Sequence, residues 1–448
     1  MKILILAPYP WCKDNSFGNT YSSIFGRVDN IEIAHVFLYN GIPDQASNVV
    51  RYYQVPENEV VRSVVLFWKR GKGAGKEILI EGSKSASRES SIQSIKPSLY
   101  QRLLSFGKRK HWGCMFFARE VAWKLGKVNY GGLLEFISDF GPDIFFLPYN
   151  NVYYTNRLAH FIKQNVDIPM VMEMGMDHYS LKRISWNPFF WADRLIKRKM
   201  IRKLARESEM LFVISRKLKE ELEDSLHVPC RILYKTPDVN REYKPYVPSN
   251  AGKIRYLFTG NIYANRWKSL AMLANELQKQ GDGKLDIYTA TPISTKMSKA
   301  LNIAGISELH ASVSQEKVIE LQNNADILVH AEAFDKYNKM LVRCAISTKI
   351  MDYLSVGRCI LAIGPSDIAS IEYLTDNDLA LSASNESQLT EIVSRVIADH
   401  SIIDKYAIKG REYSTQKLNA TEMRKALYND LMYLISNYKT SKKENEYN

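Results

Sequence analysis

Cysteine is scarce and scattered in this 448-residue sequence. The five cysteines are Cys12, Cys114, Cys230, Cys344 and Cys359, and no two of them form a C-x-x-C pair. A disulfide framework or a structural zinc site needs paired or regularly spaced cysteines, so neither is expected. This cysteine usage favours a reducing compartment, and we expect a cytoplasmic protein.

Long apolar runs are missing as well. No stretch approaches the roughly 18 apolar residues of a transmembrane helix. The start "MKILILAPYP" has too short an apolar run for a signal peptide and is interrupted by Pro8 and Pro10. Histidines and carboxylates do not gather in any metal-ligand pattern, and the stretch from Gly71 to Glu77 lacks the spacing of a phosphate loop. We therefore expect no metal and no cofactor.

Positive charge is abundant but local. The formal net charge is +13, while residues 69–127 alone carry 14 Lys/Arg against 4 Asp/Glu and residues 182–206 carry 9 against 1. The rest of the chain is therefore net negative. Basic segments 108–127 and 182–206 also contain aromatic residues, a composition typical of helices on anionic membranes. The alternative is a helix with its aromatics packed inward and a solvated basic face. The aromatic residues are Trp112, Phe116, Trp123, Phe189, Phe190 and Trp191.

Short apolar runs alternate with helical patterns along most of the chain. The runs "KILILA", "PDIFFLP", "IPMVMEM" and "EMLFVI" read as buried parallel strands in the first half, and "IRYLFT", "ADILVHA" and "RCILAI" in the second. Between the two sets, residues 235–253 contain three prolines and little apolar matter, which is typical of a linker. This pattern predicts two α/β domains, each with a doubly wound parallel sheet.

The expected domain boundaries follow from the linker. Residues 1–240 form the first domain, with a basic insertion at about 69–130, and residues 252–415 form the second. Residues 416–448 read as a C-terminal helix with a polar tail, for which packing back onto the first domain is one option. In open parallel sheets ligands bind outside the carboxyl ends of the strands, so two such domains facing each other would place a site between them.

The stretch "STKIMDYLSVGRCILAIGP" holds the most informative helix start. Ser347 or Thr348 can cap a helix in which Lys349 lies in the first turn, where the helix dipole disfavours a cation. Free backbone N–H groups, two hydroxyls and a lysine together suit a diphosphate. Asp352, one turn further on, can accept hydrogen bonds from ribose hydroxyls. The alternative is a capped crossover helix with a solvent-facing lysine.

An ordered set of segments resembles the family 4-type glycosyltransferases of the GT-B class, which have two Rossmann-like domains. The C-terminal signature is "NADILVHAE" followed by "STKIMDYLSVGRCILAIGP". "KILILAPYP" with Gly18 resembles the first strand and its donor-facing loop. "YLFTGNIYANRWKSLAMLANEL" resembles the start of the nucleotide domain. The resemblance covers most of the chain except residues 69–130, and it implies transfer of a sugar from a nucleotide diphosphate with retention and without metal.

The resemblance also implies roles for individual residues. Gly18 would face the donor. Asn261 stands where the family commonly has a cation, so that cation has to come from Arg266 or Lys268, and we expect Arg266 to bind the diphosphate together with Lys349. The family often has two glutamates eight residues apart. Here Asp352 takes the second position and Cys344 the first, so the acid that commonly contacts the donor sugar is missing or comes from elsewhere.

Asp177 and His178 follow directly after the apolar run "IPMVMEMGM". The family usually presents His or Asp there toward the acceptor, and an acid–imidazole pair can orient or deprotonate a hydroxyl. We therefore expect Asp177 and His178 to be catalytic. The alternative is that His178 caps a loop and Asp177 begins a turn.

These patterns predict a glycosyltransferase of glycan or polysaccharide biosynthesis. Its expected partners are a nucleotide-sugar, a glycan or lipid-linked acceptor and an anionic membrane surface at the inner face of the membrane, with no nucleic acid. Two alternatives stay open. One is a nucleotide-sugar epimerase or hydrolase on the same scaffold. The other is a non-catalytic, basic protein that binds membranes or nucleic acid.

Overall fold

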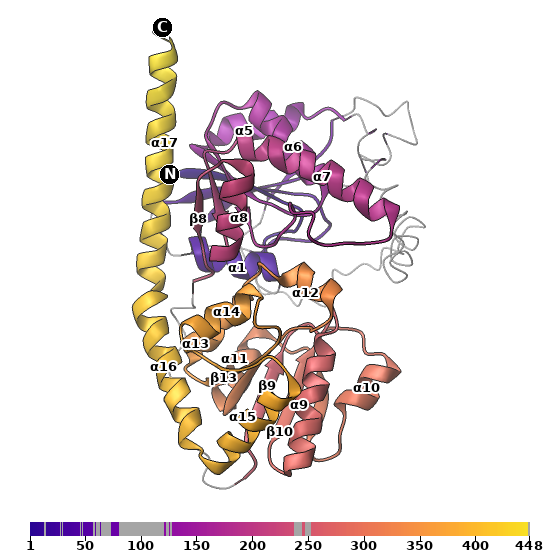
Figure 1. The fold of residues 1–448 in the computed structure, drawn as a ribbon. Coiled ribbons are helices and arrows are strands. Elements are labelled where there is room, and N and C mark those ends of the chain that lie inside the picture. Colours follow the sequence, from indigo (N-terminus) through magenta and orange to yellow (C-terminus); the bar gives the residue numbers. More distant parts are fainter. Residues whose placement is uncertain are drawn as a thin grey trace.

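The computed structural model contains two parallel-dominated sheets, each covered by helices on both faces (Figure 1). The structure describes residues 1–56 except 13, 14, 27, 29, 45 and 47. It also describes residues 73–79, 128–236, 244–246 and 252–446, and the single residues 59, 63, 121 and 125. Most of the basic segment 108–127 and most of the expected insertion at 69–130 lie outside the described residues. The expected α/β class with two doubly wound sheets is confirmed.

The first sheet has eight strands in the order β4-β3-β2-β1-β5-β6-β7-β8. All neighbouring pairs are parallel except β3 and β4. β1 lies between β2 and β5, so the strand order reverses beside it. The strands are β1 (Lys2–Ala7), β2 (Glu32–Phe37), β3 (Val49–Gln54), β4 (Lys76–Ile78), β5 (Ile144–Pro148), β6 (Met170–Met174), β7 (Met210–Val213) and β8 (Cys230–Ile232).

The second sheet has six strands, all parallel, in the order β11-β10-β9-β12-β13-β14. Here the order reverses between β9 and β12. A reversal of this kind is the topological switch point where open α/β sheets bind ligands. The strands are β9 (Arg255–Thr259), β10 (Lys284–Thr289), β11 (Ser307–Ala311), β12 (Ile327–Ala331), β13 (Cys359–Ile363) and β14 (Leu381–Ala383).

Helices cover both faces of each sheet, and their apolar sides build one core layer per face. The first domain has α1 (Ser16–Phe25), α5 (Gly131–Phe140), α6 (Tyr153–Asn165), α7 (Pro188–Arg206) and α8 (Arg216–Leu226). The second has α9 (Arg266–Gln280), α10 (Thr295–Leu301), α11 (Gln315–Asn324), α12 (Lys336–Val342), α13 (Thr348–Val356), α14 (Ala369–Asp376), α15 (Glu386–Ala398) and α16 (Ser401–Lys417). None of the described helices combines the length and apolar character needed to cross a bilayer.

The last helix returns to the first domain. α17 (Ala420–Glu446) runs from the second domain along the whole first domain (Figure 1). Its buried residues Leu427, Leu431, Leu434 and Ile435 belong to the core layer that also contains β1. The guanidinium of Arg424 donates hydrogen bonds to the Ser23 carbonyl at 2.8 and 3.0 Å. The chain therefore passes between the two domains twice, and the boundaries at residues 240 and 252 stay predictions.

Candidate active site

Lys349 lies at the switch point of the second sheet. It belongs to the first turn of α13, and its Nζ donates a hydrogen bond to the carbonyl of Thr259, the last residue of β9, at 2.8 Å. The ammonium also lies 4.6 Å from the centre of the Phe258 ring. The lysine therefore points back over the carboxyl end of the sheet, and the alternative of a solvent-facing lysine does not describe it.

Gly260 makes room for this side chain. A Cβ at Gly260 would lie 2.4 Å from Lys349 Nζ, and the glycine has a φ of +127°, which L side chains rarely adopt. The backbone amide of Gly260 is held by the Tyr288 carbonyl at 2.8 Å. The strand-to-loop turn after β9 is thus shaped around the lysine.

Arg266 and Glu332 form a two-pronged ion pair beside Lys349. Nε and Nη2 of Arg266, the first residue of α9, each lie 2.8 Å from a carboxylate oxygen of Glu332, which directly follows β12. Glu332 is buried, and the Ser269 hydroxyl donates to its backbone carbonyl. This pair uses Nε and Nη2, so Nη1 is the guanidinium nitrogen that takes no part in it.

The electrostatics link the same three groups. Burial, together with the charge of Arg266, lowers the pKa of Lys349 to about 8, while Glu332 acts in the opposite direction. The neighbouring His330 has its pKa lowered to about 3 by burial and by the charges of Lys349 and Arg266, so its ring is neutral at pH 7. Two cations and one carboxylate leave a net positive charge here, which suits an anion.

The start of α13 adds uncapped groups to this cluster. Ser347 is the N-cap residue, yet its side chain makes no capping hydrogen bond. Helix starts carry free N–H groups and a partial positive charge, which together favour a phosphate. The structure therefore brings together four of the predicted site residues: Arg266, Ser347, Thr348 and Lys349.

Asp352 is on the same helix but has a different partner. Its two carboxylate oxygens accept hydrogen bonds from Lys235 Nζ at 2.9 and 2.8 Å, and both side chains are buried. Lys235 comes shortly after β8, where the chain leaves the first domain. The carboxylate assigned to ribose hydroxyls thus forms a buried ion pair across the domain junction, and the ribose contact stays a prediction.

Gly18 lies in the first turn of α1, after β1. A Cβ there would lie 2.1 Å from the Cys12 carbonyl, and the Gly18 amide donates to the Asn15 side chain at 2.7 Å, which caps the helix. Close backbone packing accounts for the glycine, and its amide is already used by Asn15. The predicted contact of Gly18 with the donor stays a prediction.

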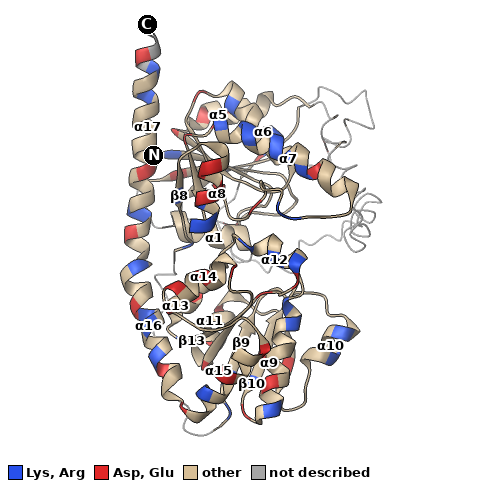
Figure 2. Ribbon diagram, in the orientation of Figure 1, with Lys and Arg blue, Asp and Glu red and all other residues tan. Residues whose placement is uncertain are grey.

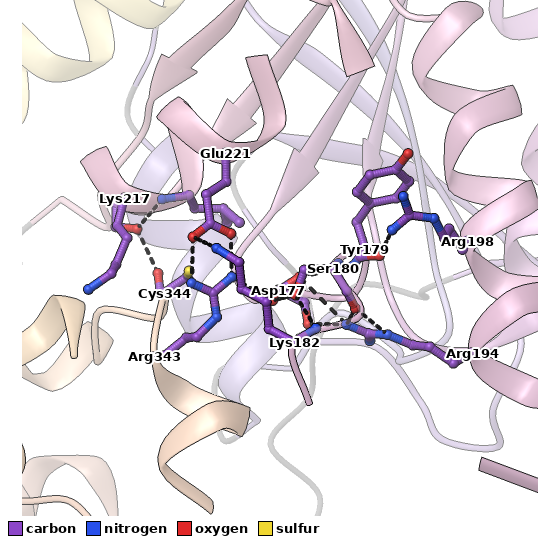
Figure 3. Close-up of polar contacts among 12 residues, drawn as sticks. Asp177, Tyr179, Ser180, Lys182, Arg194, Arg198, Lys217, Glu221, Arg343 and Cys344 are labelled. Atoms are coloured by element: carbon purple, nitrogen blue, oxygen red, sulfur yellow. Dashed lines mark hydrogen bonds and ion pairs between the residues drawn. The ribbon is translucent and has the colours of Figure 1, made fainter. Parts of the chain in front are cut away.

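Asp177 and His178 lie just after β6, as expected from the strand pattern. Oδ1 of Asp177 accepts hydrogen bonds from the Tyr179 and Ser180 amides at 3.1 and 2.8 Å, and Oδ2 accepts from Arg343 Nη2 at 2.9 Å (Figure 3). Its pKa lies below the ordinary value because hydrogen bonds from Ser180 and Arg343 outweigh the effect of burial. Asp177 is thus an ionised, fully engaged carboxylate.

The His178 ring packs against Tyr149, with ring centroids 5.4 Å apart. Burial and the charge of Arg194 lower the pKa of His178 to about 4. The ring is therefore neutral at pH 7 and can accept a hydrogen bond. The catalytic roles of Asp177 and His178 stay predictions, and they lie on the first domain while Lys349 and Arg266 lie on the second.

Glu173 is a further candidate that the sequence analysis did not single out. It interrupts the apolar strand β6, and its Oε2 accepts a hydrogen bond from the Tyr21 hydroxyl at 2.6 Å. Burial raises the pKa of Glu173 to about 7. The sequence pattern that could have identified Glu173 is a single acid inside an otherwise apolar strand. Glu332 could have been identified in a similar way, as an acid that ends the apolar run in "DILVHAE".

One group of possible metal ligands occurs among the described residues. Asp286, Glu308 and His310 gather on β10 and β11, away from the elements that carry Lys349. Lys284 Nζ lies 3.3 Å from Asp286 and 3.4 Å from Glu308, so a cation already accompanies both carboxylates. This group is compatible with an ordinary surface ion network.

No protein-family model matches this chain, and no curated protein matches it significantly. Its fold, however, resembles solved structures over their full length. Sucrose-phosphate synthase from Thermosynechococcus elongatus aligns with a TM-score of 0.60 and 11% identity, covering 96% of this chain and 99% of that one. HepE from Anabaena, solved in complex with UDP-glucose, aligns with a TM-score of 0.58 and 11% identity. The alignment covers 97% of this chain and 100% of the HepE chain.

A third structure, WaaG, is a glycosyltransferase involved in lipopolysaccharide biosynthesis. It aligns with a TM-score of 0.55 and 10% identity, covering 96% of this chain and 99% of that one. These likenesses confirm the predicted GT-B architecture of two Rossmann-like domains. At 10–11% identity they show the fold alone, so the activity has to be argued from the site.

Proposed function

We propose that this chain is a glycosyltransferase that moves a sugar from a nucleotide diphosphate to a hydroxyl acceptor. The observation that carries the proposal is the cluster of Lys349, Arg266 and Glu332 at the switch point of the second sheet, beside the start of α13. A GT-B fold supplies the setting, and three similar structures are of HepE in complex with UDP, UDP and glucose, or UDP-glucose.

The chemistry follows from the charges. As the bond from the sugar to the diphosphate breaks, negative charge develops on the departing phosphate. Lys349, the Nη1 side of Arg266 and the N–H groups at the start of α13 are held in place to stabilise that charge, which is electrostatic catalysis by fixed donors. No step of this scheme requires a metal ion, and we extend the family resemblance to propose retention of configuration.

The first domain would hold the acceptor. The neutral ring of His178 can accept a hydrogen bond from the attacking hydroxyl. Asp177 is assigned a positioning role, because its oxygens already accept hydrogen bonds from Tyr179, Ser180 and Arg343. Of the two residues expected to be catalytic, we therefore propose that His178 contacts the hydroxyl and that Asp177 positions the loop.

The test is a thermal-shift and calorimetry panel of nucleoside diphosphates, followed by an activity assay with the matching nucleotide-sugar. Specific stabilisation by one nucleoside diphosphate, lost in Lys349→Met and kept in Lys268→Met, supports the site, because Lys268 is an exposed lysine in the same helix as Arg266. Consumption of the nucleotide-sugar in the absence of any acceptor would indicate the hydrolase or epimerase. Stabilisation by oligonucleotides alone would indicate the non-catalytic alternative.

A membrane partner is supported by the surface around α7. The loop before this helix exposes apolar side chains beside Lys182, and the first part of the helix exposes further apolar residues. The second part of the helix is basic, with Lys199, Arg202, Lys203 and Arg206 exposed; Figure 2 shows the basic colouring of α7. The exposed apolar residues are Leu181, Ile184, Trp186, Phe189, Leu195 and Ile196. An apolar tip with adjoining cations matches an anionic lipid surface.

We therefore propose peripheral attachment to the inner face of the membrane through residues 182–206, in glycan or polysaccharide biosynthesis. Sedimentation with vesicles that contain or lack anionic lipid tests this. Trp186→Ser should reduce binding to anionic vesicles at least fivefold, while Tyr433→Ser, which removes an exposed aromatic from α17, should not. Equal binding by Trp186→Ser and the unmodified chain would reject this surface.

A further inference from the structure

Arg343 is a residue of the second domain whose side chain is buried in the first. It directly follows α12, and its guanidinium reaches both Asp177 and Glu221 (Figure 3). We propose that Arg343 is a positioning residue that couples the acceptor loop, residues 177–180, to the phosphate-binding start of α13. The coupling of two catalytic segments rests on the proposed function, whereas the contacts themselves do not.

Two carboxylates share this one guanidinium. Nη1 lies 2.5 Å from Glu221 Oε1 on α8, Nη2 lies 2.9 Å from Asp177 Oδ2, and Nη2 also contacts the second oxygen of Glu221. Lys182 adds a hydrogen bond to Glu221 at 2.8 Å. Arg343 and Asp177 are both about 95% buried, and the other cation near Asp177, Arg194, lies 3.6 Å from Oδ1, so removing Arg343 would take the closest charge partner from a desolvated carboxylate.

The backbone beside Arg343 is fixed to both domains. The Arg343 carbonyl accepts the Ala369 amide at 2.8 Å, which ties it to the start of α14 in its own domain. The next carbonyl, of Cys344, accepts the Ser215 hydroxyl of the first domain at 2.6 Å, and the Cys344 side chain belongs to a core layer of the first domain. Residues 343 and 344, which precede α13, are thus held against both domains.

On the first-domain side the same contact organises the acceptor loop. While Oδ2 of Asp177 binds Arg343, Oδ1 accepts the Tyr179 and Ser180 amides. Two arginines of α7 hold the loop from the other side: Arg194 donates to the Ser180 carbonyl at 2.6 and 2.9 Å, and Arg198 to the Tyr179 carbonyl at 2.6 Å. The loop that carries His178 is therefore fixed between α7 and Arg343.

On the second-domain side the distance along the chain is short. Ser347 and Lys349 follow Arg343 by four and six residues. A displacement of Arg343 would pass through this short, docked segment to the helix start that binds the phosphate. Among the described residues, Lys217 offers a comparison. Lys217 bonds Glu372 at 2.7 Å and the Asp367 carbonyl, and it does not touch the acceptor loop.

The test compares Arg343→Met with Lys217→Met, which removes a cross-domain ion pair of the same kind without touching residues 177–180. Amide hydrogen exchange of the full ligand-free chain is the first measurement. Arg343→Met should speed exchange at least tenfold in residues 177–182 and in residues 344–349, and Lys217→Met in neither. Glu221→Gln, which keeps the arginine and weakens one of its contacts, should give a smaller change at the same segments.

Kinetics supply the second measurement. Arg343→Met should lower kcat at least tenfold and also raise the Kd for UDP, used as probe, at least threefold, because the helix start that binds the phosphate loses its anchor; Lys217→Met should leave both values unchanged. The double variant with Asp177→Asn should be no slower than Arg343→Met alone. Unchanged exchange in Arg343→Met, equal changes in Lys217→Met or additive losses in the double variant would each overturn the proposal. If the unmodified chain transfers no sugar, the proposed function fails, and the exchange results still decide whether Arg343 couples the two segments.

Discussion

The lowered pKa of Lys349 makes nucleotide binding dependent on pH in a defined direction. In the ligand-free chain this pKa is about 8, chiefly because of burial and secondly because of Arg266. A bound diphosphate places negative charge beside the ammonium and returns its pKa toward or above the ordinary 10.5. Binding therefore takes up a proton wherever the free lysine is neutral, and affinity falls as the pH rises through about 8.

The magnitude follows from the occupancy of the charged form. With a pKa of about 8, roughly nine tenths of the lysines are charged at pH 7 and roughly one tenth at pH 9. Affinity for a nucleoside diphosphate should therefore fall about tenfold between these pH values, or about 1.4 kcal/mol. The neighbouring His330, with a pKa of about 3, stays neutral over this range and contributes nothing to the change.

Isothermal titration with UDP at pH 7, 8 and 9, at constant ionic strength, measures this. The terminal phosphate, with a second pKa near ~6, is already largely ionised at pH 7. Lys349→Met should bind more weakly at pH 7 and lose the pH dependence, and Lys268→Met should keep it. Two results would refute the assignment of Lys349 to the diphosphate. One is a Kd that is the same at pH 7 and pH 9, and the other is a Kd of Lys349→Met that depends on pH as strongly as that of the unmodified chain.

Three further predictions follow from buried contacts. Gly260→Ala should weaken UDP binding at least tenfold in calorimetry, because its Cβ would lie 2.4 Å from Lys349 Nζ. Lys235→Met should lower the free energy of unfolding by about 3 kcal/mol in urea titrations, because it leaves the buried carboxylate of Asp352 without its ammonium. Glu173→Gln should remove a loss of stability that the unmodified chain shows as pH rises from about 4.5 to about 7, since this carboxyl has a pKa of about 7 when folded.

Each of these has a defined contrary result. Normal UDP binding by Gly260→Ala would mean that Lys349 does not pass over that glycine when nucleotide is bound. A stability change below about 1 kcal/mol in Lys235→Met would mean that the ion pair is solvated. The direction of the Glu173 effect on stability follows from its two pKa values. Glu173 ionises at lower pH in the unfolded chain than in the folded chain, so the free energy of unfolding falls with rising pH until the folded chain also ionises at about pH 7. The same pH profile in Glu173→Gln would assign the effect to another group.

Local patterns account for most of the fold. Continuous apolar runs such as "KILILA" and "DILVHA" identified buried parallel strands, because a strand covered on both faces has no polar side. The ends of parallel strands meet at one edge, and this geometry places Lys349 beside Arg266, the pair that the resemblance indicated; their binding of a diphosphate stays a prediction. Most of the segment 108–127 lies outside the described residues, so its membrane role stays a prediction.

The partners of the polar side chains could not be predicted in this way. The contact of Lys235 with Asp352 joins residues 117 positions apart, and that of Arg343 with Asp177 joins residues 166 apart. Such pairs depend on how the two domains dock, and no periodicity in the chain encodes that. As a result, the sequence assigned Asp352 to a ribose and Asp177 to a proton, whereas the structure shows each bound to a cation from the other domain.

The path of α17 has a practical consequence for dissecting the molecule. Because Leu427, Leu431 and Leu434 complete a core layer of the first domain, a gene fragment that stops at the linker encodes that domain with a strip of its interior missing. Expressed alone, such a fragment should aggregate. Adding α17 back as a separate peptide, or grafting it onto the fragment through a flexible spacer, should restore a soluble half-molecule suitable for studying acceptor recognition by itself.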